Sequence, residues 1–297
     1  MSYKITFFSF MQEVIQQLQQ LGKVRTAETY TSTLKSFKDF RNSIDLPLRS
    51  ITSDLMLLYE AHLRRRGVCP NTISFYMRIL RAVYNRTVER GLTPQRYPFR
   101  HVYTGVDKTI KRAISISTIK ALKELDLSRH SSLAFARDLF LFSFYTRGMS
   151  FIDMAYLRKS DLKHEILTYR RHKTGQQLSI RWEKCMAEIL SNYPECQTVY
   201  LLPILKRGSD ERRQYDNALH LFNHHLKRLS EMLHLQRPLS MYVARHSWAS
   251  AAKAHNIPLS VISEGMGHDS EATTRIYLAS LETTVIDEAN KKILDLL

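Results

Sequence analysis

The N-terminal part of the chain alternates apolar stripes of helical spacing with glycine stops. One stripe ends before Gly22, a second begins near Thr26, and a third runs from about Ser53 to Gly67. Residues three and four apart share one face of a helix, so each stripe predicts an amphipathic helix. The positions expected to face the core are Phe8, Met11, Ile15, Leu18 and Leu21, then Tyr30, Leu34, Phe37 and Phe40, then Leu55, Leu58, Tyr59 and Leu63.

A fourth stretch, from Asn71 to Arg90, carries arginines beside its apolar stripe. Its apolar positions are Ile73, Met77, Leu80, Tyr84 and Val88, and Gly91 predicts its end. Together with the preceding Arg64–Arg66 run, its arginines could bind the phosphates of a duplex, although a solvated basic face has the same pattern. The candidate DNA-binding residues are Arg64, Arg65, Arg66, Arg78, Arg81 and Arg86.

The helical periodicity fails between Leu92 and Lys111, where Pro94, Pro98 and Gly105 occur. We interpret residues 92–111 as a linker between a helical domain over residues 1–105 and a second domain over residues 112–297.

The second domain combines helical stretches with one segment of strand character. Apolar periodicity near 115–125, 131–146 and 213–235 predicts helices. Between 166 and 182 apolar and polar residues alternate on either side of the turn signal Thr174-Gly175, which predicts a β-hairpin with Lys173 at its tip. The expected fold is mainly α with a small antiparallel β-sheet.

The composition favours a polyanionic partner but does not identify it. Of 297 residues, 44 are Lys or Arg and 28 are Asp or Glu, giving a formal charge of +16. The three cysteines have neither paired nor metal-ligand spacing, so we expect no disulfide framework and no structural zinc. The chain begins without a stretch of signal length and lacks the roughly 20 apolar residues of a membrane span, so we expect a cytoplasmic protein without membrane attachment.

Candidate chemistry is concentrated near the C-terminus. Ala244-Arg245-His246-Ser247-Trp248-Ala249-Ser250 precedes Gly265-Met266-Gly267-His268-Asp269-Ser270, and Thr273-Thr274-Arg275-Ile276-Tyr277 follows. Cleavage of a phosphodiester without a metal requires fixed cations on its oxygens and a nucleophile beside them. Arg245, His268 and Tyr277 are residues of these types in one ordered series.

These motifs, in this order and with a hairpin lysine and an N-terminal helical domain, resemble the tyrosine recombinase, or phage integrase, family. The resemblance covers both domains. Within the family, the chain resembles a bacterial site-specific recombinase or invertase-like branch. It implies an N-terminal SAM-like core-binding domain and a C-terminal mixed α+β catalytic domain. It also implies double-stranded DNA as partner, a homotetramer on two recombination sites, and a reaction that uses neither a metal nor ATP.

The resemblance assigns a role to each matching residue. Tyr277 would attack phosphorus to give a 3′-phosphotyrosyl link and a free 5′-hydroxyl. Arg245 would hold the phosphate with its planar fork, and His268 would contact the same oxygens and share in proton handling. Lys173 would protonate the departing 5′-oxygen. We expect Asp269 or Ser270 to begin a new helix that brings Tyr277 back to His268, and Ser240 to cap the helix of Arg245.

Two positions depart from the family pattern. Tyr242 stands where most members have a histidine three residues before Arg245; it could assist as a hydrogen-bond donor, or it could pack in the core. The first family arginine aligns with Ser150 when Asp153 is placed on the family acid. Arg147 would reach the same phosphate if the helix is continuous there, with Arg137 as the second candidate and pairing of Arg147 to Asp153 as the structural alternative.

The chain ends in an apolar amphipathic stretch with Val285, Ile286, Ala289, Ile293 and Leu296. A docking tail over about 281–297 would bind a neighbouring subunit or fold back on its own domain. Site-specific recombination by integration, excision or inversion is the expected function. A type IB topoisomerase and a DNA-binding protein that has lost catalysis are the alternatives.

Overall fold

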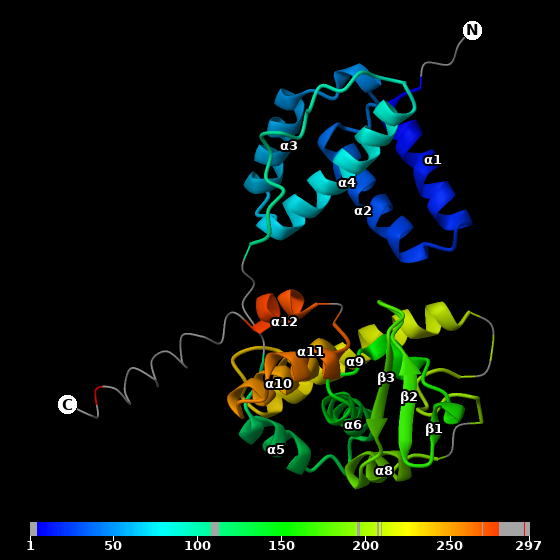
Figure 1. Cartoon of the computed structure of the whole chain (residues 1–297), viewed down its shortest axis with the longest axis vertical. Coiled ribbons are helices and arrows are strands. Elements are labelled where there is room, and N and C mark those ends of the chain that lie inside the picture. Colours follow the sequence, from blue (N-terminus) through cyan, green and yellow to red (C-terminus); the bar gives the residue numbers. More distant parts are fainter. Residues whose placement is uncertain are drawn as a thin grey trace. The chain divides into compact units, whose positions relative to one another are not determined.

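The structure is a computed structural model, and it describes residues 5–107, 113–194, 197–206, 208, 210–268, 270–278 and 294, without the side chains of 276 and 277. The chain forms two compact units, Met1–Thr109 and Ile110–Leu297 (Figure 1). We call them the first and the second unit. The fold is mainly helical with one small antiparallel sheet, which confirms the predicted class.

The first unit is a helical bundle of α1 (Phe7–Gln20), α2 (Val24–Phe40), α3 (Ser53–Arg65) and α4 (Pro70–Glu89), with a short 3-10 turn at Leu48–Ser50. All four expected helices are present. The buried face of α3 differs from the prediction, because Met56 is fully buried whereas Leu58 is 61% exposed. Leu21, expected in the core, lies beyond the end of α1 and is 69% exposed.

Residues 92–107, which the sequence assigned to the linker, pack against the first unit. The Tyr84 hydroxyl donates to the Pro94 carbonyl at 3.0 Å, and Glu60 accepts from the backbone N–H of Tyr103 at 2.8 Å. Phe99 and Val102 are buried in the core of the same unit. The irregular segment is therefore part of the first unit up to Asp107.

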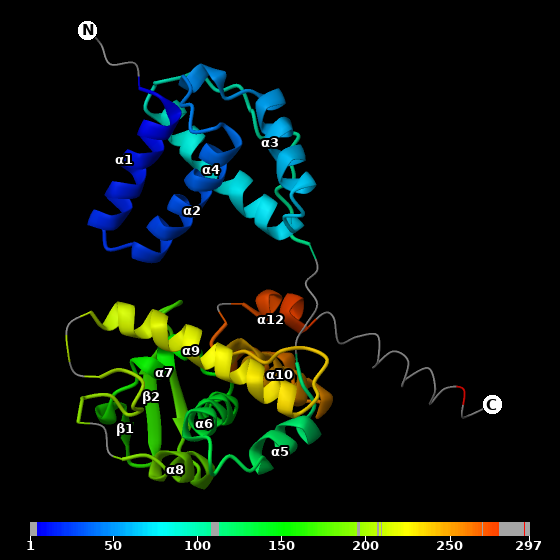
Figure 2. The same ribbon diagram turned by 180° about the vertical axis from the view of Figure 1, so that it is seen from behind.

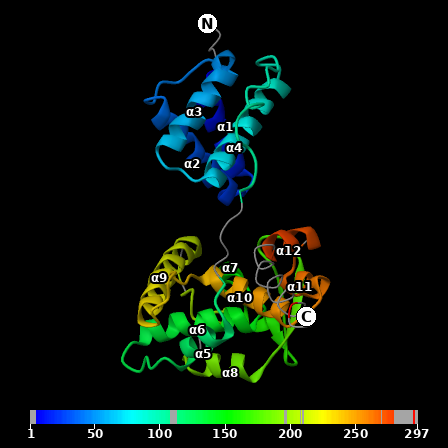
Figure 3. The ribbon, with the colours of Figure 1, turned by 90° about the vertical axis from the view of Figure 1, so that its left-hand side faces the viewer.

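The second unit contains α5 (Ile116–Glu124), α6 (Ser131–Tyr145), α7 (Phe151–Ala155), the 3-10 turn Lys159–Asp161, β1 (Leu162–Lys163), β2 (Ile166–Arg170), β3 (Gln177–Arg181), α8 (Lys184–Ser191), α9 (Glu211–Met232), α10 (Met241–Ala254), α11 (Leu259–Met266) and α12 (Glu271–Leu278). Helix α6 packs against α5, α8, α9 and α10, and the views in Figures 2 and 3 show it enclosed among them.

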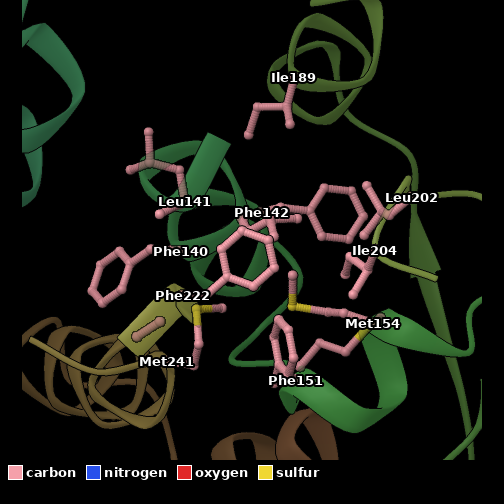
Figure 4. Packing of buried hydrophobic residues seen from close by; sticks show 14 of the residues in the cluster. Phe140, Leu141, Phe142, Phe151, Met154, Ile189, Leu202, Ile204, Phe222 and Met241 are labelled. Atoms are coloured by element: carbon pink, nitrogen blue, oxygen red, sulfur yellow. The ribbon is translucent and has the colours of Figure 1, made fainter. Parts of the chain in front are cut away.

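Helix α6 is central because it is apolar on most of its circumference. Figure 4 shows Phe142 of this helix surrounded by side chains of α7, α9 and the segment after α8. The residues packed there include Phe151, Met154, Leu202, Ile204 and Phe222, all buried. This core fixes the end of α6, from which the chain enters the site described below.

The predicted hairpin is formed by β2 and β3, which pair antiparallel with Leu167 opposite Ile180 and Tyr169 opposite Leu178. These four side chains are buried on one face, as strict alternation in a half-buried strand requires. Strand β1 adds a third, two-residue edge that the sequence did not predict.

Candidate active site

Arg245 is the centre of the site. It lies on α10 and is only 5% exposed, and its guanidinium contacts the turn after α6 and the last residue of α11. Nη1 donates to the Gly148 carbonyl at 2.9 Å and Nη2 to the Met266 carbonyl at 2.7 Å. Nη2 also lies 3.1 Å from Nε2 of His268. These contacts compensate for burial of the charge and fix the plane of a group suited to binding two phosphate oxygens.

His268 follows α11, whose C-cap Gly267 has a left-handed φ of 63°. Its Nδ1 lies 2.7 Å from the hydroxyl of Thr274, a fully buried residue of α12. The imidazole is therefore held between Arg245 of α10 and Thr274 of α12.

A new helix does begin after His268, as the sequence predicted. Helix α12 starts at Glu271, and the hydroxyl of Ser270 accepts from the backbone N–H of Thr273 at 3.4 Å. Asp269 lies outside the described residues, as does the side chain of Tyr277, whose backbone belongs to α12. The proposed nucleophile is thus on the helix that contacts His268.

The continuous helix on which the expected reach of Arg147 depended is not present. Helix α6 ends at Tyr145, Arg147 and Gly148 both have left-handed backbones with φ of 60° and 76°, and α7 starts after Ser150. Ser150, aligned with the missing arginine, is the N-cap of α7: its hydroxyl accepts from the backbone N–H of Asp153 at 3.4 Å. Helix spacing therefore does not place the Arg147 side chain on the same face as Ser150.

The turn nevertheless brings Arg147 to the end of α11, which Arg245 also contacts. Its Nη1 donates to the Ser179 carbonyl of β3 at 3.4 Å, and a Cβ placed on Gly265 would lie 3.6 Å from its Cδ. Arg137 lies elsewhere: its guanidinium donates to Asp138 at 2.8 Å and to the Leu125 carbonyl at 3.0 Å, at the end of α5. Of the two candidates, the structure groups Arg147 with Arg245.

Lys173 is exposed in the turn between β2 and β3. The turn is closed by the backbone N–H of Arg171 donating to the Gln176 carbonyl at 2.9 Å. The Arg171 side chain is buried and donates to the Gly267 carbonyl, next to His268. A hydrogen bond thus connects the base of the turn that carries Lys173 to the residue before His268.

Asp153 also contacts the turn between β2 and β3, through His172. Its buried carboxylate accepts from the backbone N–H of His172 at 2.8 Å and from the Ser150 hydroxyl at 2.6 Å, and it lies 3.2 Å from His172 Nδ1. Burial alone raises the pKa of Asp153, but the hydrogen bonds from His172 and Ser150 and the charge of Arg171 outweigh it and lower the pKa. The pairing of Asp153 with Arg147 that the sequence left open is replaced by this contact with His172.

We expect Asp153→Asn to lower the free energy of unfolding of the full chain at pH 7 by about 1–3 kcal/mol, because a buried acceptor of three groups is altered. The lowered folded-state pKa means that the carboxylate stabilises the fold fully above the unfolded pKa, about 4, and loses this effect as pH falls through the folded value. Urea unfolding between pH 3 and 7 should show the difference from wild type shrinking below about pH 4. Exposed Glu231→Gln is the control; equal losses in both variants would contradict the role of Asp153.

Tyr242 is 57% exposed, so the alternative that it packs in the core is wrong. Its ring meets that of His246 edge to face with centroids 4.6 Å apart. Ser240 occupies the N-cap position of α10, but its side chain makes no capping hydrogen bond, contrary to the prediction.

The candidate DNA-binding arginines belong to the first unit. Arg65, Arg66, Arg78 and Arg81 are exposed, and Arg86 is half-buried. Arg64 forms an ion pair with Glu60 at 2.7 Å and lies over the Tyr103 ring.

The apolar tail over 281–297 lies outside the described residues apart from 294.

Within the described ranges, no cluster of three or more His, Cys, Asp or Glu residues has a metal-binding arrangement. None of the helices in the same ranges has the length and apolar character needed to cross a bilayer.

The sequence did not single out Thr274 or Arg171 as site residues. A hydroxyl one helical turn before Tyr277 was the available signal for Thr274. No local signal marked Arg171, because its burial depends on a residue far away in the sequence. Its side chain packs against Gly267, where a Cβ would lie only 2.8 Å from the Arg171 Cδ.

The architecture is the one that the resemblance implied. A helical unit precedes a mixed unit, in which a buried arginine and a histidine lie beside the helix that contains Tyr277. Comparison with known families agrees: the phage integrase SAM-like domain matches residues 6–102, and the phage integrase family matches residues 119–283. The chain belongs to the phage integrase family.

Individual relatives are distant. Tyrosine recombinase XerD of Halalkalibacterium halodurans is 23% identical over 257 residues, covering 80% of this chain and 81% of the relative. A lambda integrase(75-356) dimer bound to a COC' core site matches 92% of this chain and 95% of its own with a TM-score of 0.72 at 16% identity. The Tn1549 transposon integrase in complex with transposon right end DNA matches 92% and 94%, with a TM-score of 0.68 at 13% identity.

Proposed function

We propose that this protein is a site-specific DNA recombinase that cleaves and rejoins strands through a 3′-phosphotyrosyl intermediate. The observation that carries the proposal is the convergence of Arg245, His268 and the Tyr277 helix through Thr274. Family membership supports the same reaction. Integration, excision and inversion share this chemistry and differ in the arrangement of the target sites.

In the proposed reaction the Tyr277 oxygen attacks phosphorus, and the bond from phosphorus to the 5′-oxygen breaks. Arg245 and Arg147 stabilise the charge on the non-bridging oxygens. Lys173 donates a proton to the 5′-oxygen, which leaves as a hydroxyl. Attack by a 5′-hydroxyl of another strand reverses the step and needs neither ATP nor a metal, because the phosphotyrosine retains the bond energy.

Arg147 takes the role of the first family arginine in this proposal. The position of its side chain supports this role, because its Cδ lies near Gly265 of α11, next to Met266, whose carbonyl accepts from Arg245. Tyr242, exposed on α10, is proposed as an assisting donor only, since its hydroxyl can donate a hydrogen bond but cannot supply a positive charge.

The first unit would bind the duplex backbone through Arg64, Arg65, Arg66, Arg78, Arg81 and Arg86. A homotetramer on two sites is the proposed assembly, in line with a lambda integrase tetramer bound to a Holliday junction, which matches 93% of this chain and 78% of its own with a TM-score of 0.72. The tail over 281–297 is the proposed contact between subunits, and the bacterial cytoplasm the proposed location.

The test begins with selection of duplexes from a random library by the full-length Tyr277→Phe chain, which should bind but not cleave. A selected duplex nicked near the scissile position loses the short strand after cleavage and traps the adduct. We expect the wild-type chain to form a covalent complex whose DNA-bearing peptide contains Tyr277, and Tyr277→Phe to form none. The same adduct with both chains would show a different nucleophile.

Two outcomes would favour the alternatives. Absence of any adduct with duplexes that bind tightly would support a protein that has lost catalysis. Relaxation of supercoiled plasmid by the monomer, without paired sites, would support a type IB topoisomerase.

A further inference from the structure

The partners of His268 define which of its ring nitrogens carries the proton. A guanidinium has only donors, so Arg245 Nη2, 3.1 Å away, must donate to Nε2. The proton of a neutral imidazole then resides on Nδ1, which donates to the Thr274 hydroxyl at 2.7 Å. This tautomer follows from the chemistry of the neighbours.

Three arginines from different elements lie around this histidine. Arg245 approaches from α10, Arg171 donates to the carbonyl of the preceding Gly267 from the end of β2, and Arg147 lies along Gly265 of α11. In the neutral Nδ1–H ring, Nε2 carries the lone pair that can accept a proton once a phosphate draws the Arg245 donors to itself.

Thr274 connects this arrangement to the nucleophile. It is fully buried, so its hydroxyl has a defined position, and it lies on α12. Position 277 follows three residues later, on the same helix face. The hydrogen bond to His268 thus depends on α12 being docked with this face toward α10.

We propose that Thr274 is a positioning residue that holds His268 in its Nδ1–H tautomer, so that Nε2 serves as the base that accepts the Tyr277 proton. The inference rests on the proposed function. The Tyr277 proton passes to Nε2 as the bond from oxygen to phosphorus forms, and Lys173 supplies the separate proton for the leaving 5′-oxygen. Tyr242 stands where most family members have a histidine, and its hydroxyl oxygen is a far weaker proton acceptor than an imidazole nitrogen.

The first half of the proposal can be tested without DNA. In the full-length chain labelled with ¹⁵N-histidine, long-range ¹H–¹⁵N correlation spectra distinguish the two tautomers, and a His268→Gln variant assigns the signals. We expect His268 to be the Nδ1–H form in wild type and in Thr274→Ser, and to move toward the Nε2–H form in Thr274→Val. An Nε2–H tautomer in the wild type would overturn the proposal.

The second half is tested by single-turnover cleavage of the nicked duplex. We expect Thr274→Val to cleave about 10- to 100-fold more slowly, as loss of the partner that orients a functional histidine generally does, and to shift the acidic limb of the pH–rate profile. Thr274→Ser should restore most of the rate. Thr273→Val, the same change at the exposed neighbouring position, is the control.

The outcomes separate this inference from the proposed function. If the wild type cleaves and Thr274→Val matches Thr273→Val in rate and pH profile, the positioning role fails while the recombinase assignment stands. If the wild type forms no adduct, the proposed function fails, and with it the base role assigned to His268. Thermal unfolding of each variant shows whether a slow rate reflects a misfolded chain, and in that event the rate and tautomer of Thr274→Ser decide.

Discussion

Arg147→Gly is expected to slow DNA cleavage by about 100- to 1000-fold while leaving the free energy of unfolding unchanged or raising it by about 1 kcal/mol. The two effects have different origins. Arg147 has a φ of 60°, a region that glycine adopts without the clash that its Cβ causes in other residues. The relief is offset in part by the greater freedom of glycine in the unfolded chain.

Cleavage is slowed because the variant removes one of two guanidinium groups proposed to stabilise the transition state. The hydrogen bond that the same change removes from the folded state is long, 3.4 Å from Arg147 Nη1 to the Ser179 carbonyl, and contributes little to stability. Duplex retention should change little, since many phosphate contacts share the binding energy.

His234→Gly is the matched control for this prediction. His234 also has a left-handed backbone, with φ 51°, and lies exposed after the end of α9 in the same unit. Both variants relieve strain of the same kind, so they should have similar unfolding midpoints in urea, whereas only Arg147→Gly should lose cleavage. A cleavage rate for Arg147→Gly equal to that of His234→Gly would remove Arg147 from the site.

The helices of both units could be predicted because their apolar faces repeat with a period that local sequence reveals. Where the prediction erred, the phase was ambiguous: Leu55, Met56, Leu58 and Tyr59 in α3 satisfy two overlapping stripes, and packing against the other helices selected Met56 over Leu58. The segment 92–107 lacked any period, and its attachment to the first unit depends on side-chain contacts to Glu60, Asn71 and Tyr84 that only tertiary structure supplies.

The candidate site was predictable only where motifs are contiguous. Arg245 and His268 were singled out from their neighbours in sequence, and the structure brings them within 3.1 Å. The turn at Arg147 was not predictable, since nothing local marks an arginine for a left-handed backbone. Its left-handed backbone closes the end of α6, where the backbone N–H of Arg147 donates to the Phe144 carbonyl at 3.2 Å and that of Gly148 to the Ser143 carbonyl at 2.8 Å.

Gly148→Ala is expected to lower the free energy of unfolding by about 2–5 kcal/mol and to abolish detectable cleavage. Its φ of 76° costs an alanine about 1–2 kcal/mol, and overpacking adds about 1–3 kcal/mol. The new Cβ would lie 2.6 Å from the Cα of Arg245, a backbone atom that a rotamer change does not move. Relief of the clash must displace α10 or the turn, and with it the hydrogen bond from Arg245 to the Gly148 carbonyl.

Gly175→Ala isolates the cause of this effect. Gly175 has nearly the same left-handed backbone, with φ 71°, but a Cβ there meets no atom within 4 Å. The alanine penalty of about 1–2 kcal/mol is therefore common to both variants, and the excess in Gly148→Ala measures the contact with Arg245. Urea unfolding of the full chain at pH 7 gives both values. Equal free energies of unfolding for the two alanine variants would mean that α10 and the turn at Gly148 can move apart without cost. Arg245 would then not be held in a fixed position, as the proposed phosphate binding requires.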